Sequence, residues 1–353
     1  MKQTELERAR VDQKTTKQTL SEQAMKPLRF GHLVIWPPFV AAPFAGYTDG
    51  VYREILREFG CPYCYTEMVS AKGLVMGGEA TLALLEHSEH DRPLAVQLFG
   101  SEPEDISEAI RAIHQADVPF DAVDINMGCP AKKVTSQGAG GALLKDISRA
   151  EAMIQAAKSA TRLPVSVKIR IGWSGGERAV EIASRLEAAG ADMIAVHGRT
   201  VAQGYSGEAD WGTIARVARS LNIPVVGNGD VTAPRQGLKL LGESGCSGIM
   251  VGRGILGNPF FFRSLYQTLR GSEPEPAAAG ERFILAIDHL HRAAQRYGER
   301  RAMLELRKHL AFYFKGMKGA SKLRTAMNGA RSWSELVDTI RHASRCFGNE
   351  LHM

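Results

Sequence analysis

Short apolar runs alternate with longer amphipathic stretches from about Phe39 onward. Each run has six or seven residues, rich in β-branched side chains, and leads into a polar or Gly-containing turn. The runs are FVAAPF (39–44), YCYTEMV (63–69), LAVQLF (94–99), AVDINM (122–127), VSVKIRI (165–171), MIAVHG (193–198), PVVGNG (224–229) and GIMVGR (248–253). The helical stretches between them include Glu104 to Gln115, Ser148 to Ala160, Glu177 to Ala189 and Pro234 to Leu241. Near-continuous apolarity predicts parallel strands that helices cover on both faces.

Eight strand-and-helix units predict an α/β fold, and eight is the count of a (β/α)8 TIM barrel, here over residues 30–270. An open doubly wound sheet is the alternative, because six of the eight units would suffice to build one. A dinucleotide-binding sheet carries G-x-G-x-x-G after its first strand, and this sequence has no such motif there. The barrel is therefore the favoured architecture.

Two segments outside the barrel differ from it in composition. Residues 271–280, GSEPEPAAAG, interrupt the pattern and predict a linker, whereas residues 1–29 are polar and are interpreted as an N-terminal extension without the apolar core of a secretory signal. Residues 281–353 carry only helical signals and predict a small all-helical C-terminal domain. Its expected helices are Glu281–Tyr297, Arg301–Phe314, Ala320–Met327 and Ser332–Cys346.

The net charge of +6 is divided unevenly along the chain. Lys and Arg outnumber Asp and Glu by seven to four in residues 1–29 and by eleven to four in residues 300–353, whereas residues 30–299 hold 26 basic and 30 acidic side chains. Because residues 30–299 are mildly acidic and the C-terminal tail is basic, the protein does not have a uniformly basic surface. Five cysteines without a secretory signal indicate reduced thiols and predict a cytoplasmic protein. No stretch is long and apolar enough to predict a transmembrane helix, so no membrane partner is expected.

Polar side chains gather at the C-terminal ends of the predicted strands, where barrel enzymes place their active sites. Lys168 is the sharpest case, because an unpaired ammonium among β-branched neighbours is costly and requires an anionic partner. A ligand is favoured as that partner, and a salt bridge to Asp124 is the alternative. For any single position, a hydrogen-bonded rim residue is the competing interpretation. The polar positions are Gln97, Asn126, Cys129, Lys168, Arg170, His197, Arg199, Asn228, Asp230 and Arg253.

Glycine-rich segments follow the last two strands, GNGD (227–230) and VGRGILGNPFF (251–261). Loops in these two positions of a barrel usually bind phosphate through backbone N–H groups, and Arg253 adds a charged fork; two tight turns are the alternative. Cys129 follows a strand end beside basic residues, which favours a reactive thiol, and a buried small apolar residue is the alternative. The pair Cys61 and Cys64 precedes a strand instead of opening a helix, so neither redox chemistry nor a metal site is expected from it.

Several stretches in this order resemble the tRNA-dihydrouridine synthases, and most closely their bacterial B-type branch. The resemblance runs from about Val40 to Asn328. The matching stretches are APFAGYTD (42–49), TEMVSAKGL (66–74), VQLFG (96–100), DINMGCPAKKV (124–134), GAGGALL (138–144), VKIRIGW (167–173), VHGRT (196–200), VGNGDV (226–231), VGRGILGNP (251–259) and LRKHLAFYFKGMKGASKLRTAMN (306–328).

The resemblance implies an FMN enzyme, reduced by NADPH or NADH, that saturates the C5–C6 bond of particular uridines in tRNA. Cys129 would be the proton donor, and Asn126 would hold the polar edge of uracil. The implied FMN contacts are Pro43, Phe44, Ala45, Gln97, Lys168, His197, Asn228, Gly229, Asp230, Gly252 and Arg253. The basic tail would bind tRNA phosphates, and the residues expected to do so are Arg307, Lys308, Lys315, Lys322 and Arg324. Phe44 departs from the family, which usually has Met there, and the N-terminal extension has no counterpart.

Three other functions compete with this interpretation. A small-molecule flavin oxidoreductase of the dihydroorotate or enoate type would share the barrel, the phosphate loops and the lysine, but would not explain the basic tail. An RNA-binding protein whose barrel has lost its chemistry would not explain the complete set of polar strand ends. A uridine of ribosomal RNA is an alternative substrate, because contacts to backbone phosphates do not distinguish one RNA molecule from another. The sequence predicts neither the uridine positions nor the oligomeric state.

Overall fold

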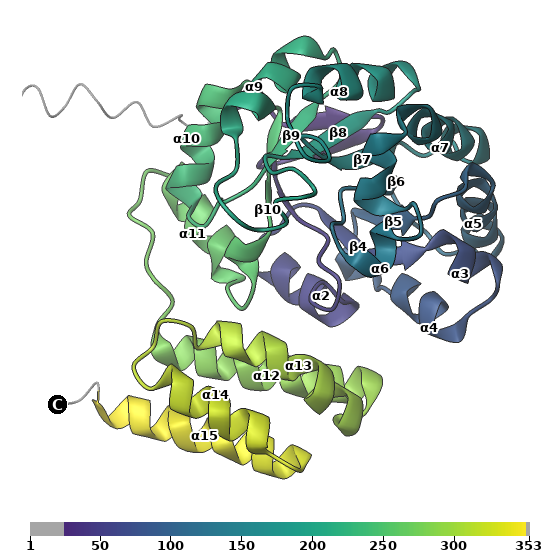
Figure 1. The fold of residues 1–353 in the computed structure, drawn as a ribbon. Helices are drawn as coiled ribbons and strands as arrows, with labels where there is room; N and C mark the ends of the chain where they lie inside the picture. Colours follow the sequence, from purple (N-terminus) through teal and green to yellow (C-terminus); the bar gives the residue numbers. More distant parts are fainter. Residues whose placement is uncertain (1–24, 351–353) are drawn as a thin grey trace, which may run out of the picture.

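A computed structural model describes residues 25–350, and eight parallel strands form its central sheet (Figure 1). Their order is β3-β10-β9-β8-β7-β6-β5-β4, and the backbone N–H of Ala41 donates to the carbonyl of Tyr63 at 3.0 Å, which joins the two edge strands. The strands are β3 (Phe39–Ala41), β4 (Cys64–Ser70), β5 (Leu94–Phe99), β6 (Ala122–Met127), β7 (Val165–Arg170), β8 (Met193–His197), β9 (Val225–Asn228) and β10 (Gly248–Val251). Seven of these eight strands fall within a predicted run, and β4 extends one residue beyond its run, to Ser70. The predicted (β/α)8 barrel is confirmed.

Helices surround the barrel strands (Figure 1). They are α2 (Gly50–Glu58), α3 (Ala71–Val75), α4 (Glu79–Leu82), α5 (Pro103–Gln115), α6 (Lys132–Thr135), α7 (Ile147–Ala160), α8 (Ala179–Ala188), α9 (Trp211–Ser220), α10 (Pro234–Ser244) and α11 (Phe260–Leu269). Local chemistry sets their ends. Asp210 caps α9 by accepting from the backbone N–H of Thr213 at 2.8 Å. Helix α10 begins with a proline and is followed by Gly245, whose φ is 75°.

The interior of the barrel is apolar at its N-terminal end and polar at its C-terminal end. Along β5 and β6, Ala95 pairs with Ala122, and two residues later Gln97 pairs with Asp124, so all four side chains share one face. A hairpin of β1 (Leu28–Phe30) and β2 (Leu33–Ile35) packs against the apolar end. The apolar interior includes Leu28, Phe30, Leu33, Ile35, Val40, Tyr63, Tyr65, Met193, Val226 and Met250.

The hairpin overlaps the end of the predicted N-terminal extension. β1 begins at Leu28, inside the segment 1–29 that the sequence assigns to a polar extension. Residues 1–24 of that extension lie outside the described residues. Among the residues that the structure describes, no helix is long and apolar enough to cross a membrane.

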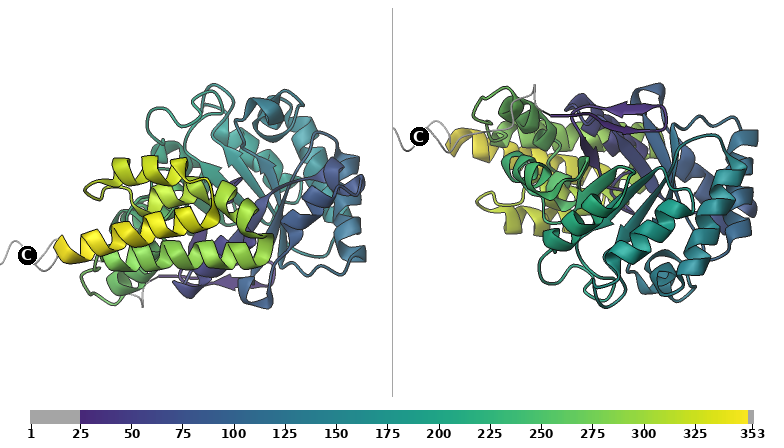
Figure 2. Two further views of the ribbon diagram at one scale, coloured as in Figure 1. Left: turned by 90° about the horizontal axis from the view of Figure 1, so that it is seen from below. Right: turned by 90° about the horizontal axis from the view of Figure 1, so that it is seen from above.

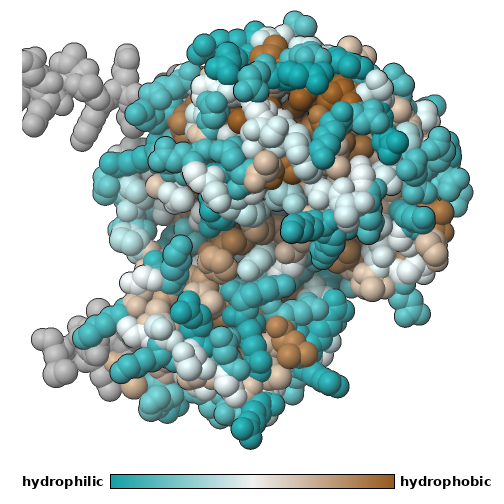
Figure 3. All heavy atoms as spheres, in the orientation of Figure 1, coloured by the Kyte–Doolittle hydropathy of each residue, from teal (hydrophilic) through white to brown (hydrophobic). Residues whose placement is uncertain are grey.

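Four helices form the C-terminal part of the chain, drawn in yellow-green in Figures 1 and 2. They are α12 (Ala279–Tyr297), α13 (Glu299–Tyr313), α14 (Ala320–Gly329) and α15 (Trp333–Glu350). Their apolar faces join the same buried cluster as the barrel helices. Tyr52 of α2 packs against both His289 and His309, with ring centroids 5.4 and 4.8 Å away. In the view of Figure 3, hydrophilic side chains cover much of the surface of both domains.

Candidate functional site

A cavity of about 510 Å³ opens at the C-terminal ends of the barrel strands. It brings together residues from β4 to β9, from loops at the strand ends, including those after β3 and β10, and from the helical domain. This one cavity is lined by every barrel residue that was predicted to contact the cofactor. Asn126, Cys129 and Lys315 of the C-terminal domain also line it. The nominated residues in its wall are Pro43, Phe44, Ala45, Gln97, Asn126, Cys129, Lys168, His197, Asn228, Gly229, Asp230, Gly252, Arg253 and Lys315.

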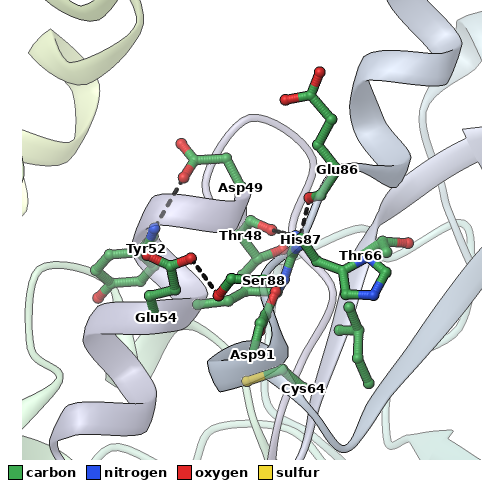
Figure 4. A network of polar contacts seen from close by, with 12 residues as sticks. Thr48, Asp49, Tyr52, Glu54, Cys64, Thr66, Glu86, His87, Ser88 and Asp91 are labelled. Carbon is green, nitrogen blue, oxygen red and sulfur yellow. Dashed lines mark hydrogen bonds and ion pairs between the residues drawn. The ribbon is translucent and has the colours of Figure 1, made fainter. Parts of the chain in front are cut away.

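The loop after β3 is held in place by a buried arginine. Arg53 of α2 donates to the carbonyl of Thr48 at 2.8 Å and pairs with Asp91 at 2.7 Å, and both of these side chains are buried. The backbone N–H of Phe44 donates to the Thr48 hydroxyl at 2.9 Å. Figure 4 shows Thr48, Asp91 and their neighbours around the start of α2. The backbone of residues 43–45 is therefore presented to the cavity by a network rooted in the barrel wall.

Lys168 lies in the cavity wall without an ion pair among the residues that the structure describes. The alternative salt bridge to Asp124 is not formed, because the Asp124 carboxylate accepts hydrogen bonds from Gln97 at 2.7 Å and Ser166 at 2.5 Å. Burial, together with the nearby charge of Arg170, lowers the pKa of Lys168 to about 8, and the Asp124 charge opposes this shift. The ammonium is thus available to an anionic ligand.

His197 is a neutral hydrogen-bond donor in the cavity wall. Burial and the positive charges of Lys168 and Arg170 lower its pKa to about 2. Its Nδ1 accepts from the backbone N–H of Arg199 at 3.1 Å, so the proton of the neutral ring is on Nε2. The ring can therefore donate one hydrogen bond from Nε2 and carries no charge.

The two glycine-rich loops meet around Asp230, which has a left-handed backbone with φ of 56°. One carboxylate oxygen accepts from Arg199 at 2.8 Å and the other from Arg253 at 2.8 Å. Gly229 has φ of 135°, and a Cβ there would lie 2.5 Å from the Cβ of Ala209. The bare backbone and the Arg253 guanidinium fit an anion such as a phosphate. Asp230 contributes by orienting Arg253, because a carboxylate by itself repels a phosphate.

Cys129 is partly exposed in the loop after β6. The Asn126 side-chain oxygen accepts from the backbone N–H groups of Gly128 at 3.1 Å and Cys129 at 2.9 Å. Gly141 donates its N–H to the Cys129 carbonyl at 3.0 Å, and a Cβ on Gly140 would lie 3.2 Å from the Cβ of Cys129. Gly140 and Gly141 thus pack closely on the cysteine loop.

Arg170 and Tyr205 are cavity residues to which the sequence assigned no role in the site. Arg170 donates to the carbonyls of Gly128 and Thr200, each at 2.9 Å, and so joins two loops of the cavity rim. Strand periodicity was a signal for Arg170, because it faces the same side of β7 as Lys168. Tyr205 lies in an irregular loop, stacks on Phe44 with centroids 6.3 Å apart, and had no sequence signal.

The five nominated tail cations do not share one surface. Lys315 lines the cavity, while Lys308 packs over the ring of Tyr47 at 5.2 Å, at the contact between the domains. Arg307 donates to the carbonyl of Ala330 and so joins α13 to the end of α14. The remaining two, Lys322 and Arg324, are exposed on α14.

The other cysteine pair lies away from the cavity. Cys61 and Cys64 are buried free thiols whose sulfurs are 3.6 Å apart. Within residues 25–350, no group of three or more His, Cys, Asp and Glu side chains is placed to hold a metal ion.

Comparisons with known proteins agree over most of the chain. The family model described as Dihydrouridine synthase (Dus) matches residues 40–347. The chain is 37% identical to the probable tRNA-dihydrouridine synthase 1 of Synechocystis sp. over 329 residues, which cover 91% of each protein. It is 35% identical to tRNA-dihydrouridine synthase B of Pseudomonas aeruginosa over 319 residues, which cover 90% of this chain and 96% of that protein.

Solved structures with a similar fold include two oxidoreductases. The 6-hydroxypseudooxynicotine amine oxidase of Pseudomonas geniculata aligns with a TM-score of 0.54 at 13% identity, and a 2-naphthoyl-CoA reductase aligns with a TM-score of 0.54 at 12% identity. The alignments cover 76% and 70% of this chain, and the chain spans about half, 52%, of each of those proteins. At such low identity the likeness shows the fold alone.

Proposed function

The chain belongs to the dihydrouridine synthase family, and we propose that it uses FMN, reduced by NADPH or NADH, to convert uridines of tRNA to 5,6-dihydrouridine. Membership of the family makes it a flavin-dependent oxidoreductase. The observation that carries the proposal is the single cavity in which Lys168, His197, Arg253 and Cys129 all take part. We also propose that it acts in the cytoplasm, where tRNA and reduced thiols are found.

The residues of the cavity fit FMN. Its volume of about 510 Å³ is within the range of cofactor sites. Arg253 and the bare backbone at Gly229 and Gly252 would hold the phosphate. At the strand ends, the Lys168 ammonium offers a positive charge and the His197 ring offers a hydrogen bond from Nε2, both of which suit the polar edge of a flavin ring.

When bound and reduced, the flavin would supply the hydride that adds to C6 of the uracil ring. The negative charge that this leaves is delocalised onto the C4 carbonyl, and C5 must then take up a proton. Cys129 is in the cavity wall with a partly exposed thiol, and we assign it that proton transfer. Asn126 holds the cysteine loop through two backbone hydrogen bonds and so positions the thiol, and we also assign it the contact to the polar edge of uracil. The target base must leave its stack to enter such a cavity.

The helical domain supports an RNA substrate over a small molecule. Lys315 comes from the segment after α13 and yet lines the barrel cavity, so this domain lies at the mouth of the site. Lys322 and Arg324 are exposed on α14 and are available to backbone phosphates. A small-molecule flavin enzyme would need neither feature.

The test uses purified protein with bound FMN and a tRNA transcript. Cys129→Ala should remain yellow and be reduced by NADPH, but should form dihydrouridine at least about 100-fold more slowly, the usual range for loss of a proton donor. Cys346→Ala removes an exposed thiol outside the cavity and should match the unaltered protein. Undiminished turnover of Cys129→Ala would remove its assigned role. Mass-spectrometric mapping of dihydrouridine in tRNA and ribosomal RNA, from cells with and without the gene, identifies the substrate RNA.

A further inference from the structure

A chain of four buried polar side chains runs across the barrel from Ser166 of β7 to the cysteine loop. Ser166 donates its hydroxyl to Asp124 at 2.5 Å, and the side-chain amide of Gln97 donates to the other carboxylate oxygen at 2.7 Å. Asn126 donates its side-chain amide to the Gln97 oxygen at 2.9 Å. The Asn126 oxygen then accepts from the backbone N–H groups of Gly128 and Cys129. All four side chains are buried, and Asp124 has no exposed surface.

The hydrogen bonds of this side-chain network all have a defined donor and acceptor, and the Asp124 carboxylate determines which group donates at each step. An ionised carboxylate accepts hydrogen bonds but cannot donate them, whereas an amide side chain can turn either end toward a neighbour. Asp124 therefore requires the NH₂ group of Gln97, which turns the Gln97 oxygen toward Asn126. Asn126 must then turn its NH₂ group toward Gln97 and its oxygen toward the loop. In the opposite orientation, the Asn126 NH₂ group would face two backbone N–H donors.

Asp124 has no ion pair that would explain its position, among the residues that the structure describes. A buried carboxylate is costly, and an apolar residue of similar volume would serve packing better. Its two hydrogen-bond donors come from the neighbouring strands β5 and β7, so it is the point at which the amide chain begins. The barrel thus retains an acceptor-only group at a place where stability alone would not favour one.

We propose that Asp124 is a positioning residue for Cys129: by accepting from Gln97 it fixes the orientation of the Gln97 and Asn126 amides, and with them the loop that carries the thiol. This rests on the proposed function only for the role of the thiol. The hydrogen-bond chain itself is tested without turnover.

Two substitutions at Asp124 separate hydrogen bonding from charge. Asp124→Asn and Asp124→Leu both remove the negative charge near Lys168, so any effect of that charge is common to both. Asn at this position can still accept from Gln97 while donating to the Ser166 oxygen, whereas Leu can do neither. A third variant, Ser166→Ala, removes one hydrogen bond from the carboxylate and leaves the orientation of the amides unchanged.

The first readout is amide hydrogen–deuterium exchange at Gly128 and Cys129 in the FMN-bound protein. Asp124→Leu should speed exchange at these two amides about tenfold, the effect of losing roughly one hydrogen bond, while Asp124→Asn and Ser166→Ala should leave it unchanged. The second readout is kinetic. Asp124→Leu should lower the rate of dihydrouridine formation about tenfold without slowing flavin reduction by NADPH, because that step does not use Cys129.

Equal effects of Asp124→Asn and Asp124→Leu would overturn the proposal in favour of an electrostatic role toward Lys168. Unchanged exchange in Asp124→Leu would also overturn it. If the Leu variant does not fold, the swap Asp124→Asn with Gln97→Glu moves the acceptor-only group one place along the chain and keeps the orientation of Asn126. In the flavin-free protein, the double variant should then show native exchange at Gly128 and Cys129, and faster exchange there would overturn the proposal. A protein that retains this pattern but leaves tRNA uridines unreduced would refute the proposed function alone.

Discussion

Lys168→Met is expected to stabilise the flavin-free protein while impairing its function. Met has nearly the length of Lys and no charge, so it fills the same space without a buried ammonium. Burial and Arg170 lower the pKa of Lys168 from 10.5 to about 8. Each unit of such a shift corresponds to about 1.4 kcal/mol, so the charged lysine costs the folded state about 3 kcal/mol. The Met variant should gain up to that amount in free energy of unfolding at pH 7.

The pH dependence follows from the direction of the shift. Below pH 8 the lysine is protonated in both the folded and the unfolded protein, so the charged lysine destabilises the folded state by the full amount. Between pH 8 and 10.5 the unfolded chain binds a proton that the folded protein has released, so the stability of the unaltered protein rises with pH. The advantage of the Met variant should therefore be largest at pH 7 and should disappear toward pH 10.5.

Urea unfolding of the flavin-free proteins at pH 7, 8, 9 and 10 measures this difference. Lys322→Met is the control, because this lysine is exposed and its replacement should change the free energy of unfolding by less than about 0.5 kcal/mol at every pH. If Lys168→Met is less stable than the unaltered protein at pH 7, or if its gain in stability does not depend on pH, burial does not destabilise the charged lysine as argued. The same variant should bind FMN more weakly, since it lacks the cation at the strand ends.

Two further predictions concern the tail and the glycine loop. Lys322→Ala should lower the slope of log tRNA affinity against log salt concentration by about one and leave FMN affinity unchanged. Lys315→Ala should have the same effect on the slope and should also lower turnover at saturating tRNA, because Lys315 lines the cavity. Filter binding and steady-state kinetics measure both effects, and identical behaviour of the two variants would contradict this prediction. Gly229→Ala should lower the free energy of unfolding more than Gly271→Ala. Both glycines have positive φ, but only a Cβ at position 229 would lie 2.5 Å from the Cβ of Ala209. Equal shifts in melting temperature would show that backbone strain alone accounts for the loss of stability.

Much of the barrel could be predicted because its strands carry their own signal. A run such as VSVKIRI is apolar throughout only if both faces are covered, and a lysine inside it stands out for the same reason. The glycines near Arg253 likewise marked an anion site by residue type and position. Tyr205 had no such signal, because an irregular loop has no periodicity from which its direction could be derived.

Three features could be derived from the sequence alone: the repeat of strands and helices, the end of the barrel at which polar groups gather, and the basic character of the tail. These are properties of residue type and spacing along the chain. The tertiary structure decided which polar groups satisfy one another, because hydrogen-bond partners come from different strands. It placed Asp124 against Gln97 instead of Lys168, and it gave His197 its tautomer through the Arg199 backbone. It also divided the tail cations, bringing Lys315 into the cavity while joining Arg307 to the end of α14.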